Sequence, residues 1–165
     1  MRRKDREMDA EFARMILDKC EYAVLGMTGP EGWPYNVPVT ITRRGEELFF
    51  HCALEGQKVD CLRRDGRVCV TAVGNTHIPP DKFTTEYESA VAFGLAEEVT
   101  DPVEKTEALR LLCQRHVPSN MADFEASVAR SLGRTGVWRI KITGLTGKRK
   151  KYDTAGKEMK FGRME

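Results

Sequence analysis

The sequence has no apolar run of about 18 residues, so no segment is long enough to cross a bilayer as a helix. No apolar segment of signal-peptide length follows the charged start MRRKDREMDAEF, and no secretory signal is expected. The five cysteines contain no C-x-x-C pair, which disfavours structural zinc and is typical of reduced thiols. These absences predict a soluble cytoplasmic protein without a membrane partner or a metal site.

A strong excess of either charge is also missing. The chain has 27 Lys and Arg residues against 25 Asp and Glu residues, and this balance gives little reason to expect a nucleic-acid partner. Residues 148–165 are the exception, because they are distinctly basic. We interpret this basic tail either as a solvated chain end or as a segment that covers a phosphate site on a partner subunit.

Repeated strand–helix units are absent, which disfavours a doubly wound parallel sheet. Instead, most of the β-like segments are joined by short turns. A small antiparallel barrel with flanking helices fits this order best. The chain contains six such segments, residues 20–28, 33–42, 48–52, 68–73, 85–100 and 137–148.

Helical patterns flank these strands. A helix is expected over residues 9–19 with Asp9 as its N-cap, and a short helix after Lys58. Another begins at Asp101-Pro102, and a further one is capped by Ser119 or Asn120. The buried face of the helix at 102 is expected to contain four apolar residues, namely Val103, Ala108, Leu111 and Leu112.

The most informative stretch is Leu48–Arg64, which passes from a strand into a helix. His51 and Cys52 end the strand, and Gly56 precedes Gln57 and Lys58 at the predicted helix start. A helix N-terminus has unpaired N–H groups and a partial positive charge, so it attracts anions, phosphate above all. The stretch is therefore half of a phosphate-bearing cofactor site, or else an ordinary solvated helix start.

Two other strands have unusual polar or backbone features. Pro34 and Pro38 remove backbone donors, so residues 33–42 should form an edge strand or a bulged one. Its free backbone groups could contact a planar ring, or nothing. In the strand at 85–100, Ser89 shares a mostly apolar face and is either hydrogen-bonded in the core or a donor to a ligand. Gly94 predicts a kink in the same strand.

The order of these motifs resembles the FMN-binding split barrels of the pyridoxamine 5′-phosphate oxidase-like superfamily, and most closely the nitroimidazole-resistance branch. The resemblance spans about residues 9–148 and implies a single domain over residues 1–165, a six-stranded antiparallel split β-barrel of Greek-key type with flanking α-helices. Residues 1–8 and 149–165 would be flexible or interface tails. The matching residues are Asn36–Thr40, Phe49–Ala53, Glu55–Lys58, Tyr87–Val91, Phe93-Gly94, Trp138–Ile140 and Thr143-Gly144.

The resemblance also implies roles for individual residues. The isoalloxazine ring of FMN would lie along four residues, Val37, Pro38, Val39 and Thr40. His51 and Cys52 would sit at the flavin, while Gln57 and Lys58 would hold its phosphate. Ser89, with Tyr87 nearby, would complete the phosphate or ribityl side. Members of this superfamily are usually homodimers with each flavin between two subunits, and Trp138 could then reach across the interface.

The function that this resemblance implies is an FMN-dependent oxidoreductase. It would take electrons from a reduced donor and pass them to a small planar acceptor. His51 would either donate a proton to the acceptor or only hydrogen-bond the flavin or a neighbouring residue. Pyridoxamine phosphate oxidation itself is not expected, because Glu55–Lys58 has one cation where those oxidases have a Ser-Arg-Lys motif. The alternatives are a non-enzymatic flavin carrier or sensor, and a haem-handling split barrel with axial ligands among His51, His77 and His116.

Overall fold

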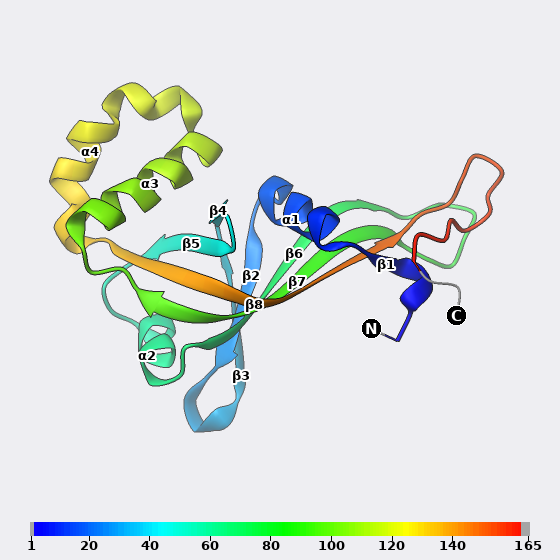
Figure 1. The fold of residues 1–165 in the computed structure, drawn as a ribbon, viewed down its shortest axis with the longest axis horizontal. Coiled ribbons are helices and arrows are strands. Elements are labelled where there is room, and N and C mark those ends of the chain that lie inside the picture. Colours follow the sequence, from blue (N-terminus) through cyan, green and yellow to red (C-terminus); the bar gives the residue numbers. More distant parts are fainter. Residues whose placement is uncertain (1, 163–165) are drawn as a thin grey trace.

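The computed structural model describes residues 2–162, which form one large sheet with helices at its ends and sides (Figure 1). The eight strands are β1 (Glu7–Met8), β2 (Ala23–Thr28), β3 (Pro34–Val39), β4 (Thr42–Arg44), β5 (Glu47–Cys52), β6 (Arg67–His77), β7 (Glu86–Glu98) and β8 (Gly136–Lys150). The α-helices are α1 (Ala10–Lys19), α2 (Gln57–Arg64), α3 (Pro102–His116) and α4 (Phe124–Ser131). None of the described helices is both long and apolar enough to cross a membrane.

Every strand pair in the sheet is antiparallel, and the strand order is β3-β2-β6-β7-β8-β5-β4 with β1 beside β8. This confirms the predicted mainly antiparallel fold with flanking helices. Two short strands, β1 and β4, add to the six predicted ones, and β3 and β4 end the path without pairing with each other. The strand with two prolines, β3, is an edge strand, as its missing donors indicate.

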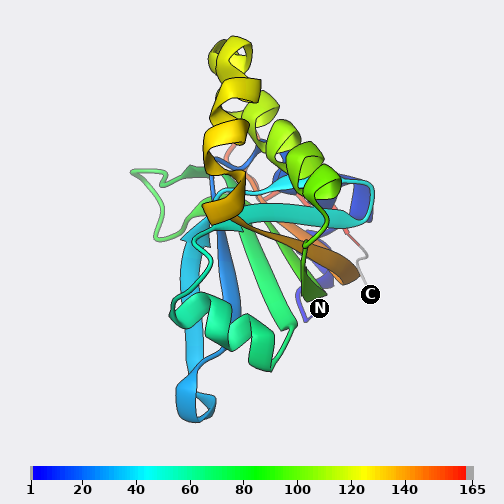
Figure 2. The same ribbon diagram turned by 90° about the vertical axis from the view of Figure 1, so that its left-hand side faces the viewer.

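The core is divided between two clusters that meet at β5. The main cluster lies inside the curved sheet, and a second one lies under α3 and α4. Neighbouring residues of a strand face opposite sides, so Phe50 belongs to the main cluster and Phe49 to the second. Figure 2 shows the consequence: the α3–α4 pair and α2 lie on opposite sides of β5.

Several local expectations can be compared with the structure. Asp9 caps α1 by accepting a hydrogen bond from the backbone N–H of Phe12 at 2.7 Å, which confirms that cap. The predicted inner face of α3 is partly wrong, because Val103 is exposed and Leu109 is buried instead. The strand expected over residues 68–73 is longer than predicted, since β6 continues to His77 by pairing with β7 after an irregularity at residues 73–76.

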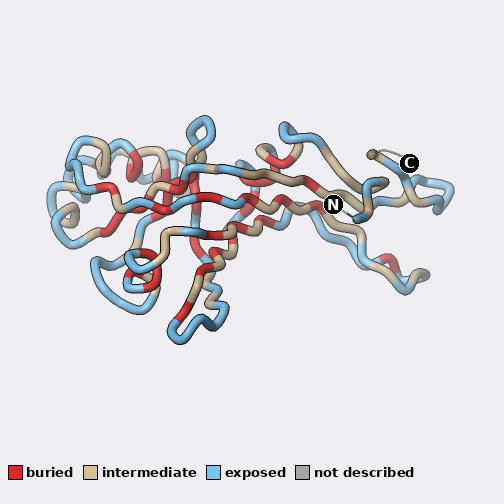
Figure 3. Tube along the Cα trace, turned by 60° about the horizontal axis from the view of Figure 1, so that its bottom comes forward, coloured by how far each residue is buried: buried red, intermediate tan, exposed pale blue. Residues whose placement is uncertain are grey.

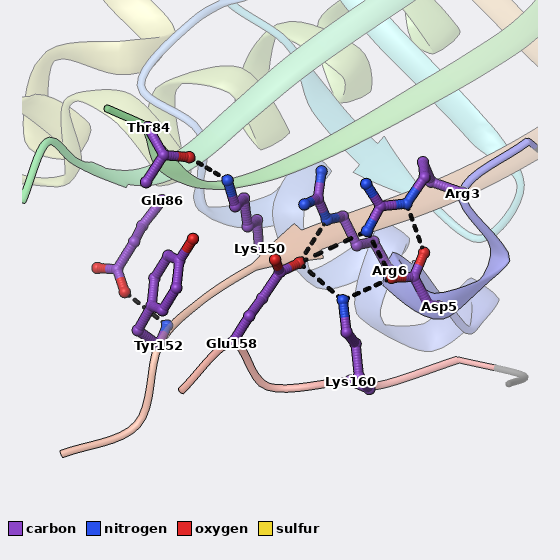
Figure 4. A network of polar contacts seen from close by, with 9 residues as sticks. All are labelled: Arg3, Asp5, Arg6, Thr84, Glu86, Lys150, Tyr152, Glu158 and Lys160. Atoms are coloured by element: carbon purple, nitrogen blue, oxygen red, sulfur yellow. Dashed lines mark hydrogen bonds and ion pairs between the residues drawn. The ribbon is translucent and has the colours of Figure 1, made fainter. Parts of the chain in front are cut away.

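The two ends of the described chain are joined by ion pairs (Figure 4). Asp5 accepts hydrogen bonds from Arg3 and Lys160, which lower the pKa of its carboxyl group. Glu158 accepts a hydrogen bond from Arg6 at 2.7 Å, and this contact and Lys160 lower its pKa to about 2. The basic tail therefore packs against the N-terminal segment. That residues 1–8 and 149–165 act as tails stays a prediction, and Met1 and residues 163–165 lie outside the described residues.

The far ends of β6, β7 and β8 extend from the body as a long arm (Figure 1). Figure 3 shows that buried residues gather in the body, whereas this arm is largely exposed or half-buried. Along β7, Ala90 and Ala92 face the core, and Val91 and Phe93 lie on the outer face. The hydroxyl of Ser89 is on the same outer face, so it is not inside the main core.

Gly94 gives a direct test of the sheet geometry. The pairing of β7 with β8 shifts register between Phe93 and Gly94, and a Cβ on Gly94 would lie 2.5 Å from the backbone oxygen of Lys141. We expect Gly94→Ala to lower the free energy of unfolding by about 1–3 kcal/mol, because backbone would have to move. Urea denaturation followed by circular dichroism measures this change.

Gly144 is the matched control, because it pairs opposite Phe93 and a Cβ there would meet its nearest atoms at 3.9 Å, an ordinary contact. Gly144→Ala should change the free energy of unfolding by less than about 1 kcal/mol, the usual difference between Gly and Ala in a strand. Equal losses in the two variants would show that close packing at Gly94 does not constrain the sheet.

Candidate functional site

The start of α2 has the features of an anion site. Gly56, the N-cap, has a φ of 121°, a conformation that favours glycine, and no side chain caps the helix at this point. The first N–H groups of the helix therefore have no intrahelical acceptor and no side-chain cap. Together with the positive end of the helix dipole, these groups can bind a phosphate.

Lys58 adds a full positive charge to this corner. Its side chain is half-buried, and its Nζ lies 5.6 Å from the ring centroid of Phe50 in β5. The neighbouring Gln57 is exposed and supplies a neutral donor and acceptor. The structure thus places the predicted phosphate residues at one helix start, beside the end of β5.

The end of β5 carries two titratable side chains on opposite faces. His51 lies on the α3–α4 side and is exposed at the mouth of the cavity, where partial desolvation of its ring lowers the pKa of the imidazole, with smaller contributions from Lys58 and His116. Cys52 packs against the main core, and burial raises the pKa of its thiol. Both groups are therefore held in their neutral forms near pH 7.

A cavity of about 410 Å³ opens beside His51, between β5 and the α3–α4 pair. Thr40 and His51 line it on the sheet side, and Cys113 and His116 line it from α3. The Nε2 atom of His116 lies 2.8 Å from the carbonyl oxygen of Ile41 and must donate to it, since a carbonyl oxygen only accepts. The sequence indicated His116 only as a possible axial haem ligand and gave Cys113 no role, although their spacing of one helical turn beside apolar residues was a usable signal for a shared cavity.

The residues predicted to line a flavin ring lie along the end of β3. Val39 is buried and Val37 is half-buried against the main core, whereas Pro38 and Thr40 are exposed. The strand ends at Val39, so Thr40 lies in the following connection and reaches the cavity beside His51. Since β3 pairs only with β2 within the described residues, its other edge keeps unpaired backbone groups.

Within a single chain, Ser89 and Tyr87 do not lie near Lys58 at the start of α2. Ser89 pairs with Lys148, whereas Glu98 of the same strand pairs with Trp138 and binds Arg63 of α2 at 3.0 Å. Nine residues separate Ser89 from Glu98, which is about 30 Å along a strand. Any contribution of Ser89 and Tyr87 to a site at Lys58 therefore has to come from a second chain.

The structure corrects the expectation for Trp138 at a subunit interface and narrows the set of histidines that could act together. Trp138 is only 2% exposed and belongs to the main core, so the expectation that it reaches across a subunit interface is wrong. It points inward because β8 alternates and Trp138 pairs opposite Phe50. His77 lies at the exposed end of β6 opposite Glu86 and does not line the cavity, so only His51 and His116 lie together there.

The family model described as pyridoxamine 5′-phosphate oxidase matches residues 9–149. Among curated protein sequences none matches this chain. The family match spans the sheet from β2 to Arg149 of β8 and all four α-helices, including the α2 corner and the cavity.

Several solved structures share the fold. A candidate 5-nitroimidazole antibiotic resistance protein from Bacteroides thetaiotaomicron VPI-5482 is 24% identical, with a TM-score of 0.74 over 87% of this chain and 86% of that one. A FAD- and haem-binding protein from Mycobacterium smegmatis is 21% identical, with a TM-score of 0.76 over 88% and 73%. The flavocytochrome Anf3 from Azotobacter vinelandii is 20% identical, with a TM-score of 0.73 over 95% and 79%. At these identities the likeness shows the fold.

The lowered pKa of His51 can be tested through Lys58. Lys58→Met removes a positive charge that disfavours the imidazolium ion, so the pKa of His51 should rise toward its ordinary value of about 6.5. An NMR titration of the imidazole resonances measures the shift. Lys157→Met, which removes a lysine from the exposed tail, should leave the pKa of His51 unchanged. A His51 pKa that does not respond to Lys58→Met would place the lysine charge away from the imidazole.

Proposed function

The chain belongs to the pyridoxamine 5′-phosphate oxidase family, and from this premise we propose that it is an FMN-binding oxidoreductase that reduces a small planar acceptor. The observation that carries the proposal is the uncapped start of α2 with Lys58, which follows the end of β5 where His51 and Cys52 lie. The related structures named for nitroimidazole resistance and for FAD binding support a flavin and an acceptor of this kind.

The corner at α2 fits the phosphate of FMN. Gly56 has no Cβ, so a phosphate can come close to the free N–H groups that follow it, and Lys58 supplies a counter-charge. Gln57 would add a neutral hydrogen bond. Since Lys58 is the single cation in Glu55–Lys58, this corner is matched to one phosphate group.

The ring of the flavin would lie along Val37, Pro38, Val39 and Thr40, where the free edge of β3 can hydrogen-bond the ring heteroatoms. The neutral thiol of Cys52 adds no charge beside it. FMN supplies the electron-transfer chemistry when it is bound, and the chain binds and orients it.

His51 is the catalytic residue that we propose. Its imidazole lines the cavity between β5 and the α3–α4 pair, so it can contact an acceptor in that cavity. Reduction of a nitro or carbonyl group consumes protons, and a histidine can transfer one at an imidazole nitrogen. The lowered pKa of His51 makes the protonated ring a stronger acid than an ordinary histidine.

We also propose a homodimer with FMN at the subunit interface. The outer face of β6 and β7 exposes Val73, Phe93 and Leu95, whose exposed fractions are 51%, 54% and 46%. Apolar side chains grouped on one sheet face are typical of a protein contact. A second copy on this face would allow Ser89 and Tyr87 of one chain to serve the Lys58 corner of the other.

The flavin is tested by an absorption spectrum of the purified protein, with mass identification of any group released on denaturation. FMN should be released, or should bind when it is added. Protein that stays colourless after incubation with FMN would refute the flavin, and a Soret band would support the haem-handling alternative. Turnover of a nitroimidazole with a reduced nicotinamide then separates an oxidoreductase from a flavin carrier or sensor, which would bind FMN without turnover.

Lys58→Ala tests the phosphate corner. The variant loses a charge-assisted contact of about 1.5–3 kcal/mol, so the Kd for FMN should rise about tenfold or more. The Kd for riboflavin, which has no phosphate, should change far less. Fluorescence titration measures both constants, and Lys157→Ala in the exposed tail is the control. Equal increases in the Kd for FMN and for riboflavin would show that Lys58 does not bind the phosphate.

Phe93→Glu tests the proposed interface. A charge on the outer face of β7 should be costly to bury between two copies, so the variant should be monomeric in sedimentation velocity and should bind FMN more weakly. Met15→Glu is the control, because Met15 is 42% exposed on α1, a helix that packs on the opposite, inner side of the sheet through Ile16 and Leu17. A Phe93→Glu protein that stays dimeric would place the interface elsewhere.

A further inference from the structure

We infer that the cavity between β5 and the α3–α4 pair binds the electron acceptor, and that this acceptor is an uncharged, compact aromatic molecule with a polar substituent. The inference rests on the proposed function, because it assigns a substrate class to the cavity that adjoins His51. It also disfavours phosphate-bearing substrates, which the family name alone would suggest.

The size and walls of the cavity suit a small molecule. Its volume of about 410 Å³ falls within the usual range of small-molecule sites, about 300–1,000 Å³. Leu109 and Leu112 of α3 line one side, and Phe124 and Val128 line the α4 side. These aliphatic and aromatic side chains can pack against both faces of a planar ring.

The charge of the lining selects among possible acceptors. No Asp, Glu, Lys or Arg is among the described residues that line the cavity, so an ionised substituent would have no counter-charge apart from a protonated histidine. Taking an unpaired charge out of water is strongly unfavourable. A phosphorylated or carboxylated substrate is therefore disfavoured, and a neutral ring is favoured.

Polar groups are present but few, and they can orient a polar substituent. Because Nε2 of His116 donates to the carbonyl oxygen of Ile41, its Nδ1 is the remaining ring nitrogen for a ligand contact. Thr40 contributes a hydroxyl group and His51 its imidazole, whereas the hydroxyl of Thr135 already donates to the carbonyl oxygen of Ser131 at 2.9 Å. A nitro or carbonyl group near His51 would have donors within the lining, while the ring fills the apolar part.

The cavity is held open by contacts independent of any ligand. Arg115 donates hydrogen bonds to the carbonyl oxygens of Ile41 and Cys20, at 2.8 and 2.7 Å, next to the His116 contact with Ile41. Three hydrogen bonds thus fix the end of α3 to the segments before β2 and β4. A pre-formed cavity loses little entropy on binding, which favours a rigid ligand.

Cys113 is a reporter for occupation of the cavity. Its thiol is half-buried in the lining, whereas the half-buried Cys69 lies on β6 away from it.

Three probes share a nitrophenyl ring and differ in charge: neutral 4-nitrobenzyl alcohol, anionic 4-nitrobenzoate and cationic 4-nitrobenzylamine. The neutral probe should slow alkylation of Cys113 by iodoacetamide at least about fivefold at saturation, without changing the rate at Cys69. The charged probes should need at least about tenfold higher concentrations, which corresponds to about 1.4 kcal/mol.

A matched pair of variants localises the effect. Ser127 lines the cavity from an exposed position on α4, and Ala129 is exposed two residues later without lining it. Ser127→Trp should remove the protection of Cys113 by the neutral probe, and Ala129→Trp should retain it. Both variants should bind FMN like the unaltered protein, because neither position lies at the Lys58 corner.

The outcomes separate this inference from the proposed function. If the neutral probe protects Cys113 in protein that does not bind FMN, binding of a neutral aromatic molecule in the cavity is supported and the proposed FMN-dependent reaction is refuted. If the protein binds FMN but the neutral probe does not protect Cys113, or if the three probes protect it equally, the inference about the cavity is overturned. The proposed FMN site is unaffected by either result. Protection that survives Ser127→Trp also overturns the inference, since the probe would then bind outside the cavity.

Discussion

The alternation of side chains along β5 is the constraint on which the site depends. Phe49 and Phe50 anchor opposite faces of this strand in separate clusters, and burial of each ring contributes about 1.5–3 kcal/mol. The next two residues inherit these directions, so His51 faces the helical side and Cys52 the main core. A shift of one residue would exchange these faces and bury a histidine inside the sheet.

The same strand separates two kinds of chemistry. On one side, the start of α2 and Lys58 form a polar corner that is suited to a phosphate. On the other side, α3 and α4 enclose an apolar cavity without an acidic side chain, a lysine or an arginine among its described lining residues. His51 lines the cavity, and partial desolvation lowers the pKa of its imidazole, with a smaller contribution from the positive charge of Lys58.

Local rules predicted much of the fold from particular residues. The prolines at 34 and 38 indicated an edge strand, Asp9 indicated a helix cap, and Gly94 indicated an irregular strand, all of which the structure contains. The errors arose where packing decided between similar patterns. Val103 has the polarity of a core residue, but it lies in the first turn of α3 and is 67% exposed, because that turn presents it to solvent while Ala108, Leu109 and Leu112 take the buried face.

The sequence by itself determined which residues begin and end elements, and which neighbours share a face, because these properties depend on backbone dihedrals and on periods of two and 3.6 residues. It therefore placed Gly56, Gln57 and Lys58 at a helix start. Only the tertiary structure decided that His116, 65 positions after His51 in the chain, reaches the same cavity, and that Ser89 lies far from Lys58. Such distances follow from strand order and helix docking, which are set by long-range pairing and burial.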